Sequence, residues 1–581
     1  MNYYNLMDNT YIMFDMAFMQ QAKAISEKLN IKTISYISYE KESETHEWLT
    51  REFLSKAITR LIIPLSLQSN ETDGLNIALH IRLNYQLPIE QRLIPIIIVS
   101  NLTLDNIATK CVFDIDNNTQ NLLFTQGLSV SSTDVDEIVE KLSSTEPLLP
   151  EEYPFFLKKM AINRKAMSGH HDIANAWGCF KLSQVVGYDI TSPKIKDYLG
   201  QMYSKWLICQ NNAFAKTITN PITTSTIPCK NKRILYIDDK ADEGWGELMQ
   251  YIFKDAGDGF VYVNPSKYKT HGFDFESFQN ECESYIGQKW DLILIDLRLN
   301  PDVEDVDNAD IAPMELSGYK LIDSFLEYNS GYQIIVFTAS NKIWNVDAAI
   351  QRGARGYYIK ESPSFAQSIL DTKASYEKNF IVKVKQCFWD CYLYDIFEKK
   401  YEIGENLPKD EFGNELYGQL DIAYELISTA KTDEQFAYAY VSLYMIIEII
   451  NKYLVSNQGN RWFLPSGIQL HEIGFNKRNN WYEDLGKYEK EEKPSQRQMI
   501  TGLIKQEWKI SNWQNMSMEL HSYIHKRNGF VHNDEDILNE KYMDKNGNVK
   551  YSNHDIYSHV AFVNLFNCLY GIIPRLYKKV D

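Results

Sequence analysis

The chain has 581 residues, enough for three or four domains with separate cores. Its formal net charge of −17 argues against a general binder of duplex DNA, although a locally basic groove is compatible with an acidic total. No apolar run approaches the roughly 18 residues of a membrane span, and residues 1–15 lack a secretion signal. We therefore expect a cytoplasmic protein without membrane contact.

Residues 1–145 alternate short strand patterns with helical patterns. Strands are expected at 10–14, 32–37, 60–67 and 94–99, and helices at 18–29, 45–56 and 74–84. This alternation favours βαβ units around a parallel sheet.

Residues 146–230 have the pattern of a helical connector with a Thr-, Pro- and Ser-rich exit at 217–228, a composition typical of a linker. His170, His171 and Trp177 lie in this connector. Adjacent histidines at a helix start are more typical of capping or packing than of a site, so we assign them no chemistry.

Segment 231–372 contains four apolar runs that each end at a polar residue. The runs and the residues after them are 234–237 with Asp238 and Asp239, 292–295 with Asp296, 334–337 with Thr338, and 357–359 with Lys360. Such runs are typical of strands buried on both faces of a parallel sheet. The ligand crevice of such a sheet lies at the carboxyl ends of its strands, so these side chains should share one site.

In the order and spacing of these residues, segment 231–372 resembles the receiver domain of two-component response regulators, which has a flavodoxin-like fold. The resemblance implies that Asp296 accepts a phosphoryl group from a sensor histidine kinase or a phosphotransfer protein. It also implies that Asp238, Asp239 and Asp296 hold Mg²⁺ together with a backbone carbonyl near Arg298. Three converging carboxylates repel one another and are stable as anions only around such a hard cation.

Three further residues match the phosphate switch of this family. Thr338 matches the switch hydroxyl, Tyr357 the rotating aromatic residue and Lys360 the lysine that contacts phosphate. Phosphoryl transfer relies mainly on positioning and charge neutralisation, which the cation and Lys360 would supply, and Thr338 can hydrogen-bond the new phosphate oxygens.

Two features depart from the family pattern. The loop at 300–316 is long and acidic, which would restrict access of a kinase or add a second cation-binding surface, and Glu361 stands where the family usually has proline. Two alternatives therefore stay open. The acids are merely solvated strand ends of a flavodoxin-like domain, or the domain is held unphosphorylated in one state by partner contacts.

The N-terminal segment repeats the same order of elements. Pro64 stands where the acceptor acid would be, Ser100 corresponds to Thr338, and only Asp15 corresponds to the acid pair. We interpret residues 1–145 as a degenerate receiver that cannot be phosphorylated but can dimerise or dock; the alternative is an unrelated α/β domain.

Residues 373–581 show helical patterns throughout, including a capping-box pattern at Thr432 and Gln435, and no strand-like alternation. We expect an all-α bundle. Within it, residues 527–532 read R-N-G-F-V-H, and the helix pattern at 444–454 carries Glu448 and Lys452.

The motif at 527–532 resembles the signature of HEPN domains, helical bundles found in many prokaryotic RNases. The resemblance implies RNA cleavage without a cofactor, with Arg527 binding the scissile phosphate, His532 moving a proton and Asn528 orienting the pair. Positions five apart on a helix differ by about 140°, so Arg527 and His532 share a face only if the helix starts or bends near Gly529. Two copies in a homodimer would solve this, as the family implies.

The hypothesis from sequence is thus a multidomain α/β plus all-α response regulator, with a HEPN-like RNase effector that serves stress or antiphage defence. One alternative is a non-catalytic adaptor whose bundle only binds a protein or RNA. In a second, Arg527 pairs with a nearby acid on a surface helix and His532 is incidental.

Overall fold

The computed structural model describes residues 8–37, 39, 42–67, 72–113, 117–159, 170–191, 226–270, 272–304, 315–339, 343–360, 369–459, 461–475, 481–484, 493–534, 541–543, 549–552 and 556–576. The chain divides into two compact units. One comprises Met1–Ser324 with Gln333–Phe388, and the other comprises Phe325–Tyr332 with Trp389–Asp581. Among the described residues, no helix is long and apolar enough to span a membrane.

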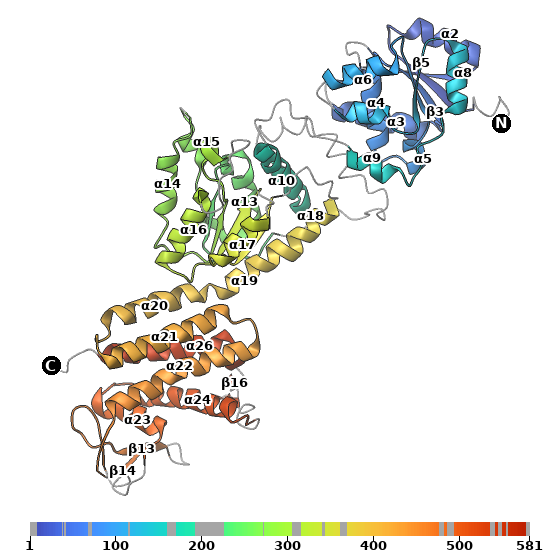
Figure 1. The fold of residues 1–581 in the computed structure, drawn as a ribbon. Helices are drawn as coiled ribbons and strands as arrows, with labels where there is room; N and C mark the ends of the chain where they lie inside the picture. The colour runs from blue at the N-terminus through green and yellow to red at the C-terminus, as the bar shows by residue number, and fades with distance from the viewer. Residues whose placement is uncertain are drawn as a thin grey trace. The chain divides into compact units, whose positions relative to one another are not determined.

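The first sheet has five parallel strands in the order β2-β1-β3-β4-β5. Its strands are β1 (Thr10–Phe14), β2 (Lys32–Ser35), β3 (Arg60–Pro64), β4 (Ile96–Val99) and β5 (Leu128–Ser131). Its helices are α2 (Met19–Leu29), α3 (Glu42–Ser55), α4 (Asp73–Leu83), α5 (Ile89–Arg92), α6 (Leu104–Phe113), α7 (Asn117–Leu123), α8 (Val135–Ser144) and α9 (Tyr153–Lys159). This is the doubly wound order 2-1-3-4-5 of flavodoxin-like folds. Figure 1 shows helices on both faces of the sheet, among them α4 and α8.

The core of this first domain continues past residue 145. Tyr153 and Phe156 of α9 are buried in the same apolar cluster as β3 and β4, and the Tyr153 hydroxyl donates to the carbonyl of Arg82. The Arg82 guanidinium is itself fully buried and donates to the carbonyls of Ile94 and Gly127 at 2.8 and 3.0 Å. These hydrogen bonds offset the cost of burying the charge.

A pair of buried histidines should make the first domain acid-sensitive. Burial lowers the pKa of His46 to about 4, and burial together with His46 lowers that of His80 to about 3. The unfolded chain takes up these protons near pH 6.5 and the folded chain does not, so stability is present above that pH and falls below it. We expect a loss on the order of 1.4 kcal/mol per pH unit for each histidine between about pH 6.5 and 4. Hydrogen exchange of β3 and β4 amides, corrected for intrinsic rates, should show this slope, and His80→Phe should about halve it; an unchanged slope would contradict the assignment.

The second sheet is also fully parallel, with the order β10-β9-β8-β6-β7. Its strands are β6 (Ile234–Ile237), β7 (Phe260–Tyr262), β8 (Leu292–Ile295), β9 (Ile334–Thr338) and β10 (Gly356–Ile359). Its α-helices are α13 (Trp245–Ile252), α14 (Phe275–Glu283), α15 (Pro301–Glu304), α16 (Ser317–Tyr328), α17 (Ile343–Gln351), α18 (Ile369–Ser375) and α19 (Val382–Asp390). Read from its own first strand, this order is again 2-1-3-4-5, as the sequence predicts.

Helix α10 (His170–Val186) belongs to the second domain, although it precedes the first strand by almost fifty residues of sequence. Trp177, Cys179, Leu182 and Val185 join a cluster with side chains of β6, β8 and α13, and each is at most 2% exposed. The same cluster includes Phe380, from the π-helical stretch between α18 and α19. A helix that is buried around its circumference shows no amphipathic pattern, which fits this placement.

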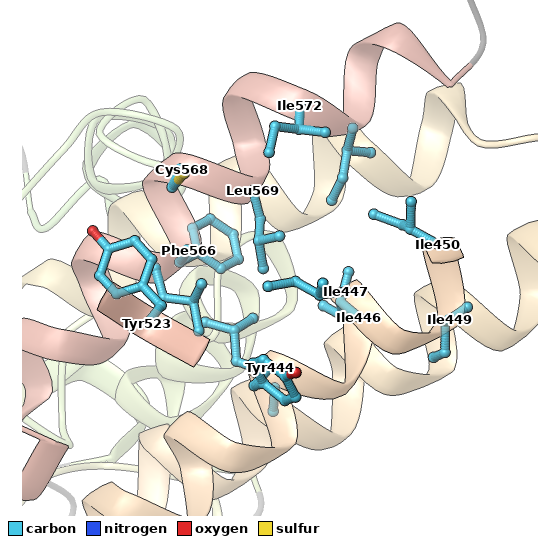
Figure 2. Close-up of a cluster of buried hydrophobic side chains, with 14 of the residues drawn as sticks. Tyr444, Ile446, Ile447, Ile449, Ile450, Tyr523, Phe566, Cys568, Leu569 and Ile572 are labelled. Atoms are coloured by element: carbon cyan, nitrogen blue, oxygen red, sulfur yellow. The ribbon is translucent and has the colours of Figure 1, made fainter. Parts of the chain in front are cut away.

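The second compact unit, Phe325–Tyr332 with Trp389–Asp581, is built mainly of helices. These are α20 (Tyr392–Asn406), α21 (Glu411–Thr429), α22 (Asp433–Leu454), α23 (Gln496–Gly502), α24 (Trp513–Val531) and α26 (His559–Ile572). Figure 2 shows its core, where the apolar side chains of α22, such as Ile446 and Ile447, meet Tyr523 of α24 and Phe566 and Leu569 of α26.

The N-terminus of α22 has the capping box that the sequence predicts. The Thr432 side chain accepts from the Gln435 amide, and the Gln435 side chain accepts from the Thr432 amide. This reciprocal pair satisfies two amides at the start of the longest helix of the unit.

The expectation of uninterrupted helices after residue 373 is wrong. The described residues include three antiparallel two-stranded sheets. Their strands are β11 (Ser456–Gln458) with β12 (Arg461–Phe463), β13 (Glu472–Phe475) with β14 (Trp481–Asp484), and β15 (Lys541–Met543) with β16 (Val549–Ser552). Strands of three or four residues are too short to show a period of two in the sequence.

Candidate functional site

The acids of the second sheet converge because neighbouring strands end side by side. Ile237 of β6 pairs with Ile295 of β8, and the Asp296 amide donates to the Ile237 carbonyl at 2.9 Å. Asp238, Asp239 and Asp296 are each at most 3% exposed, and one carboxylate oxygen from each lies within 4.8 Å of the others. The structure thus brings together the three acids that the sequence analysis selects.

Lys360 completes this cluster from the far side of β9. Its amide donates to the Thr338 carbonyl at 2.7 Å, which fixes the position where the chain leaves β10. From there its Nζ donates to Asp238 Oδ2 at 2.6 Å and to Asp296 Oδ2 at 2.7 Å, with no side-chain exposure. The ammonium also lies 5.1 Å from the ring centre of Trp245, close enough for a cation–π contact.

The electrostatics of the cluster follow from its burial. Desolvation raises the pKa of Asp238 against the opposing attraction of Lys360, and the nearby Asp296 raises it further. Burial by itself would lower the pKa of Lys360, but Asp238 and Asp296 outweigh burial and raise it, so the lysine stays an ammonium. The Tyr236 hydroxyl donates to Asp238 Oδ2, and burial and this acid hold the pKa of Tyr236 well above its ordinary value.

The donor set fits a hard divalent cation. Three carboxylates face two ammonium groups, those of Lys360 and of Lys240, whose Nζ lies 3.7 Å from Asp239 Oδ2, so the pocket keeps excess negative charge. Carboxylate oxygen is the ligand type that Mg²⁺ prefers. Arg298 stands beside this set: its amide donates to Asp296 Oδ1 at 3.3 Å, and its guanidinium donates to the Glu304 carbonyl. A role of the Arg298 carbonyl as a further ligand stays a prediction.

The two predicted switch residues lie on the adjacent strands. Thr338 is the last residue of β9 and is 1% exposed, and Tyr357 is buried on β10, which pairs with β9 in register. Their positions beside the acids are those expected from the sequence, and their roles stay predictions.

In the acidic loop after Asp296, Glu304 has a role that was not anticipated. Glu304 is 4% exposed and accepts from the amides of Leu299 and Ser317 at 3.0 and 2.7 Å and from the Ser317 hydroxyl at 2.9 Å. It therefore ties the start of the loop to the start of α16, a structural role. The remainder of the predicted loop at 305–314 lies outside the described residues.

Sequence reasoning missed Asn175 of α10. Its side-chain Oδ1 accepts from Lys360 Nζ at 2.8 Å, and its carbonyl accepts from Trp245 Nε1 at 3.1 Å. Asn175 is separated from Lys360 by 185 positions and belongs to no motif, so no local pattern connects the two. Trp177, singled out in the sequence, is a packing residue, and the side chains of His170 and His171 lie outside the described residues.

The motif at 527–532 lies at the end of α24. Arg527 is half-buried, with its guanidinium 5.2 Å from the ring centre of Tyr444 and Nη2 3.5 Å from Glu448 Oε1, both on α22. Asn528 Oδ1 accepts from Arg527 at 3.3 Å. His532 is exposed and is the C-cap. The helix neither starts nor bends at Gly529, so the condition for placing Arg527 and His532 on one face within one chain is not met.

One protein family matches the part of this chain that forms the first sheet. The family described as Inactive Receiver domain matches residues 9–131. These residues are therefore similar to a receiver domain. No curated protein matches the sequence.

Solved structures similar to this chain include response regulators. One is a CheY-like receiver domain protein from Methanospirillum hungatei JF-1, with 15% identity over 27% of this chain and 97% of that chain and a TM-score of 0.17. Two others are two-component response regulator/GGDEF domain proteins, with 9% and 10% identity, coverage of 65% and 64% of this chain and 99% of each of theirs, and TM-scores of 0.17.

The match of residues 9–131 to the Inactive Receiver domain family agrees with the interpretation of a degenerate receiver. A pair of glycines shows which residues correspond in the two sheets. A Cβ on Gly318 would lie 2.2 Å from the Asp296 carbonyl oxygen, and one on Gly74 would lie 2.1 Å from the Pro64 carbonyl oxygen. Each glycine therefore lies against the residue at the predicted acceptor position of its sheet. In the sheet of residues 9–131 that residue is Pro64, which has no carboxylate to phosphorylate.

Proposed function

We propose that the chain is a response regulator in which the second sheet carries the working phosphoacceptor, Asp296. The observation that supports this most strongly is the buried cluster in which Lys360 Nζ lies 2.6 Å from Asp238 and 2.7 Å from Asp296, beside Asp239. A solvated strand end would not bury three carboxylates against the ammonium groups of Lys360 and Lys240, because burial of charge without full compensation is strongly unfavourable.

The transfer step needs little covalent chemistry from the protein. An Asp296 carboxylate oxygen attacks the phosphorus of a donor, the new O–P bond forms, and the bond to the donor's leaving group breaks. Lys360 holds the acceptor carboxylate in place and offers its N–H groups to the phosphoryl oxygens. Asp238 and Asp239 would hold Mg²⁺ together with Asp296, and that cation would neutralise charge on the transferring group. A histidine kinase or phosphotransfer protein is the proposed donor.

The full chain should gain the mass of one phosphoryl group when incubated with acetyl phosphate and Mg²⁺. The gain should vanish with EDTA and in Asp296→Asn, which keeps the size of the side chain but removes the nucleophilic carboxylate. Asp302→Asn is a matched control, because Asp302 is exposed on α15 of the same domain. A full gain in Asp296→Asn would remove this function, as would absence of any gain in both the wild type and Asn175→Ala.

We infer that the C-terminal bundle is the output, an RNA-cleaving effector of HEPN type that acts as a homodimer without a metal. Arg527 is held in place by Glu448 and Tyr444 of a neighbouring helix, while His532 is exposed at the helix end, where a ligand can reach it. Within one chain Arg527 and His532 lie on different faces of the helix, so a shared cleft requires a second copy. The alternative is an adaptor that binds a protein or RNA without cleaving it.

A further inference from the structure

Helix α10 reaches the cluster around Asp296 through the side chain of Asn175. Asn175 is 6% exposed and makes two hydrogen bonds there, from Lys360 Nζ to its side chain at 2.8 Å and from Trp245 Nε1 to its carbonyl at 3.1 Å. Beneath it, Asp296 is 3% exposed and Lys360 fully buried. Asn175 therefore occupies a position beside Lys360 Nζ that an oxygen of a phosphoryl group on Asp296 would take.

All three N–H groups of the Lys360 ammonium already donate hydrogen bonds in this structure. An ammonium has three N–H groups, and three acceptors receive them here, from Asp238, Asp296 and Asn175. A phosphoryl group on Asp296 would add negative charge and new acceptor oxygens beside Lys360. Bonds between charged groups are stronger than bonds to a neutral amide, so Asn175 is the acceptor that Lys360 would exchange.

The rest of α10 is fastened to the same domain away from the acids. Trp177, Phe180 and Val185 are buried in the core shared with the sheet, and just past the end of the helix the Thr191 amide and hydroxyl donate to Glu247 of α13 at 3.0 and 2.6 Å. The helix is therefore a resident part of the domain. Among the contacts of α10 that the structure describes, the hydrogen bond between Asn175 and Lys360 is the one that a phosphoryl group on Asp296 would displace.

We propose that α10 is a lid, latched by Asn175, and that the closed lid and phosphorylated Asp296 exclude each other. The lid would keep the acceptor unreactive until a partner or a thermal fluctuation opens it, and phosphorylation would hold it open. This inference rests on the proposed function of Asp296.

The chain contains a native reporter of this lid. Cys179, one helical turn after Asn175, is a free thiol with no exposed surface. Cys282 of α14 is a free and equally buried thiol of the same domain, outside α10. Alkylation of Cys179 by N-ethylmaleimide, measured relative to Cys282 by peptide mass spectrometry, reports opening of α10 independently of phosphoryl transfer.

The test compares Asn175→Ala with Gln184→Ala, because Gln184 is an exposed residue of the same helix. Loss of the Asn175 side-chain bond should raise both the initial rate of phosphorylation by acetyl phosphate and the alkylation of Cys179 about tenfold, and Gln184→Ala should change neither. In the wild-type full chain, treatment with acetyl phosphate and Mg²⁺ should itself accelerate alkylation of Cys179. This last measurement needs no variant and stands even if Asn175→Ala folds poorly.

These measurements distinguish failure of the lid proposal from failure of the proposal that Asp296 is phosphorylated. If the wild type is phosphorylated but Asn175→Ala reacts no faster, or Cys179 stays as protected as before, the lid is wrong and the phosphoacceptor remains. If neither chain gains a phosphoryl group, the proposal that Asp296 is a phosphoacceptor is wrong, and the lid proposal, which depends on it, is wrong as well. If Asn175→Ala is phosphorylated and the wild type is not, the result supports both Asp296 as the phosphoacceptor and α10 as a lid that stays closed in the wild type.

Discussion

Lys360→Met is expected to destabilise the second domain by about 3–5 kcal/mol in the absence of divalent cations. The Lys360 ammonium is the cation that lies between Asp238 and Asp296, at 2.6 and 2.7 Å, and all three side chains are buried. Methionine fills a similar volume but leaves two carboxylates facing each other without compensation. Native-state hydrogen exchange of the β6 and β8 amides measures the effect in the full chain.

The chain offers a control and two ways to check the cause. Lys267→Met removes a lysine of the same domain whose side chain is 57% exposed, and it should cost less than about 1 kcal/mol. Desolvation raises the pKa of Asp238, so lowering the pH should protonate this acid in the folded variant and recover part of the loss. Mg²⁺ at about one hundred times its dissociation constant should restore about 2.7 kcal/mol. A loss that neither acid nor Mg²⁺ reduces would show that Lys360 acts only through packing.

His532→Ala is expected to lower the rate of RNA cleavage by the activated protein at least about a hundredfold, because a positioned acid or base typically contributes that much. His532 is exposed at the end of α24, so its removal should leave the fold intact. The measurement is decay of a labelled RNA by the phosphorylated full chain, with thermal unfolding recorded for both proteins.

Two comparisons make this result specific. His471→Ala removes another histidine of the same unit, which pairs with Glu483 at 3.0 Å, and should leave cleavage unchanged. A mixture of Arg527→Ala and His532→Ala chains should recover part of the activity if one cleft takes its arginine and its histidine from different protomers. Undiminished decay in His532→Ala would exclude the nuclease, and binding without decay in the wild type would favour the adaptor.

The sequence predicts the strands of the second sheet where burial is continuous. Runs such as 292–295 are apolar on both faces and end at charged residues, so the strand and the position of its end are both visible. The edge strand β7 has three half-buried residues and no such run, and it was missed. The convergence of Asp238, Asp239 and Asp296 was predictable because strand ends of a parallel sheet meet at one edge.

The parts that escaped prediction depend on tertiary contacts. Asn175 is an amide in an aromatic helix, and only the folded chain brings it to Lys360. Gly529 was a plausible place for a helix to bend, but it is buried within α24, which continues past it to Val531. Glu304 looked like one acid in a solvated run, and its burial among amides follows from the return of the chain at Ser317.

The most direct test of the account is to locate the phosphoryl group after exhaustive treatment of the full chain with acetyl phosphate and Mg²⁺. Reduction of the acyl phosphate with borohydride followed by peptide mapping identifies the modified residue. The account predicts one modified position per chain, Asp296, and no modification within residues 9–131, where Pro64 occupies the equivalent position. Modification of the first domain, or of any acid other than Asp296 in the second, would contradict it.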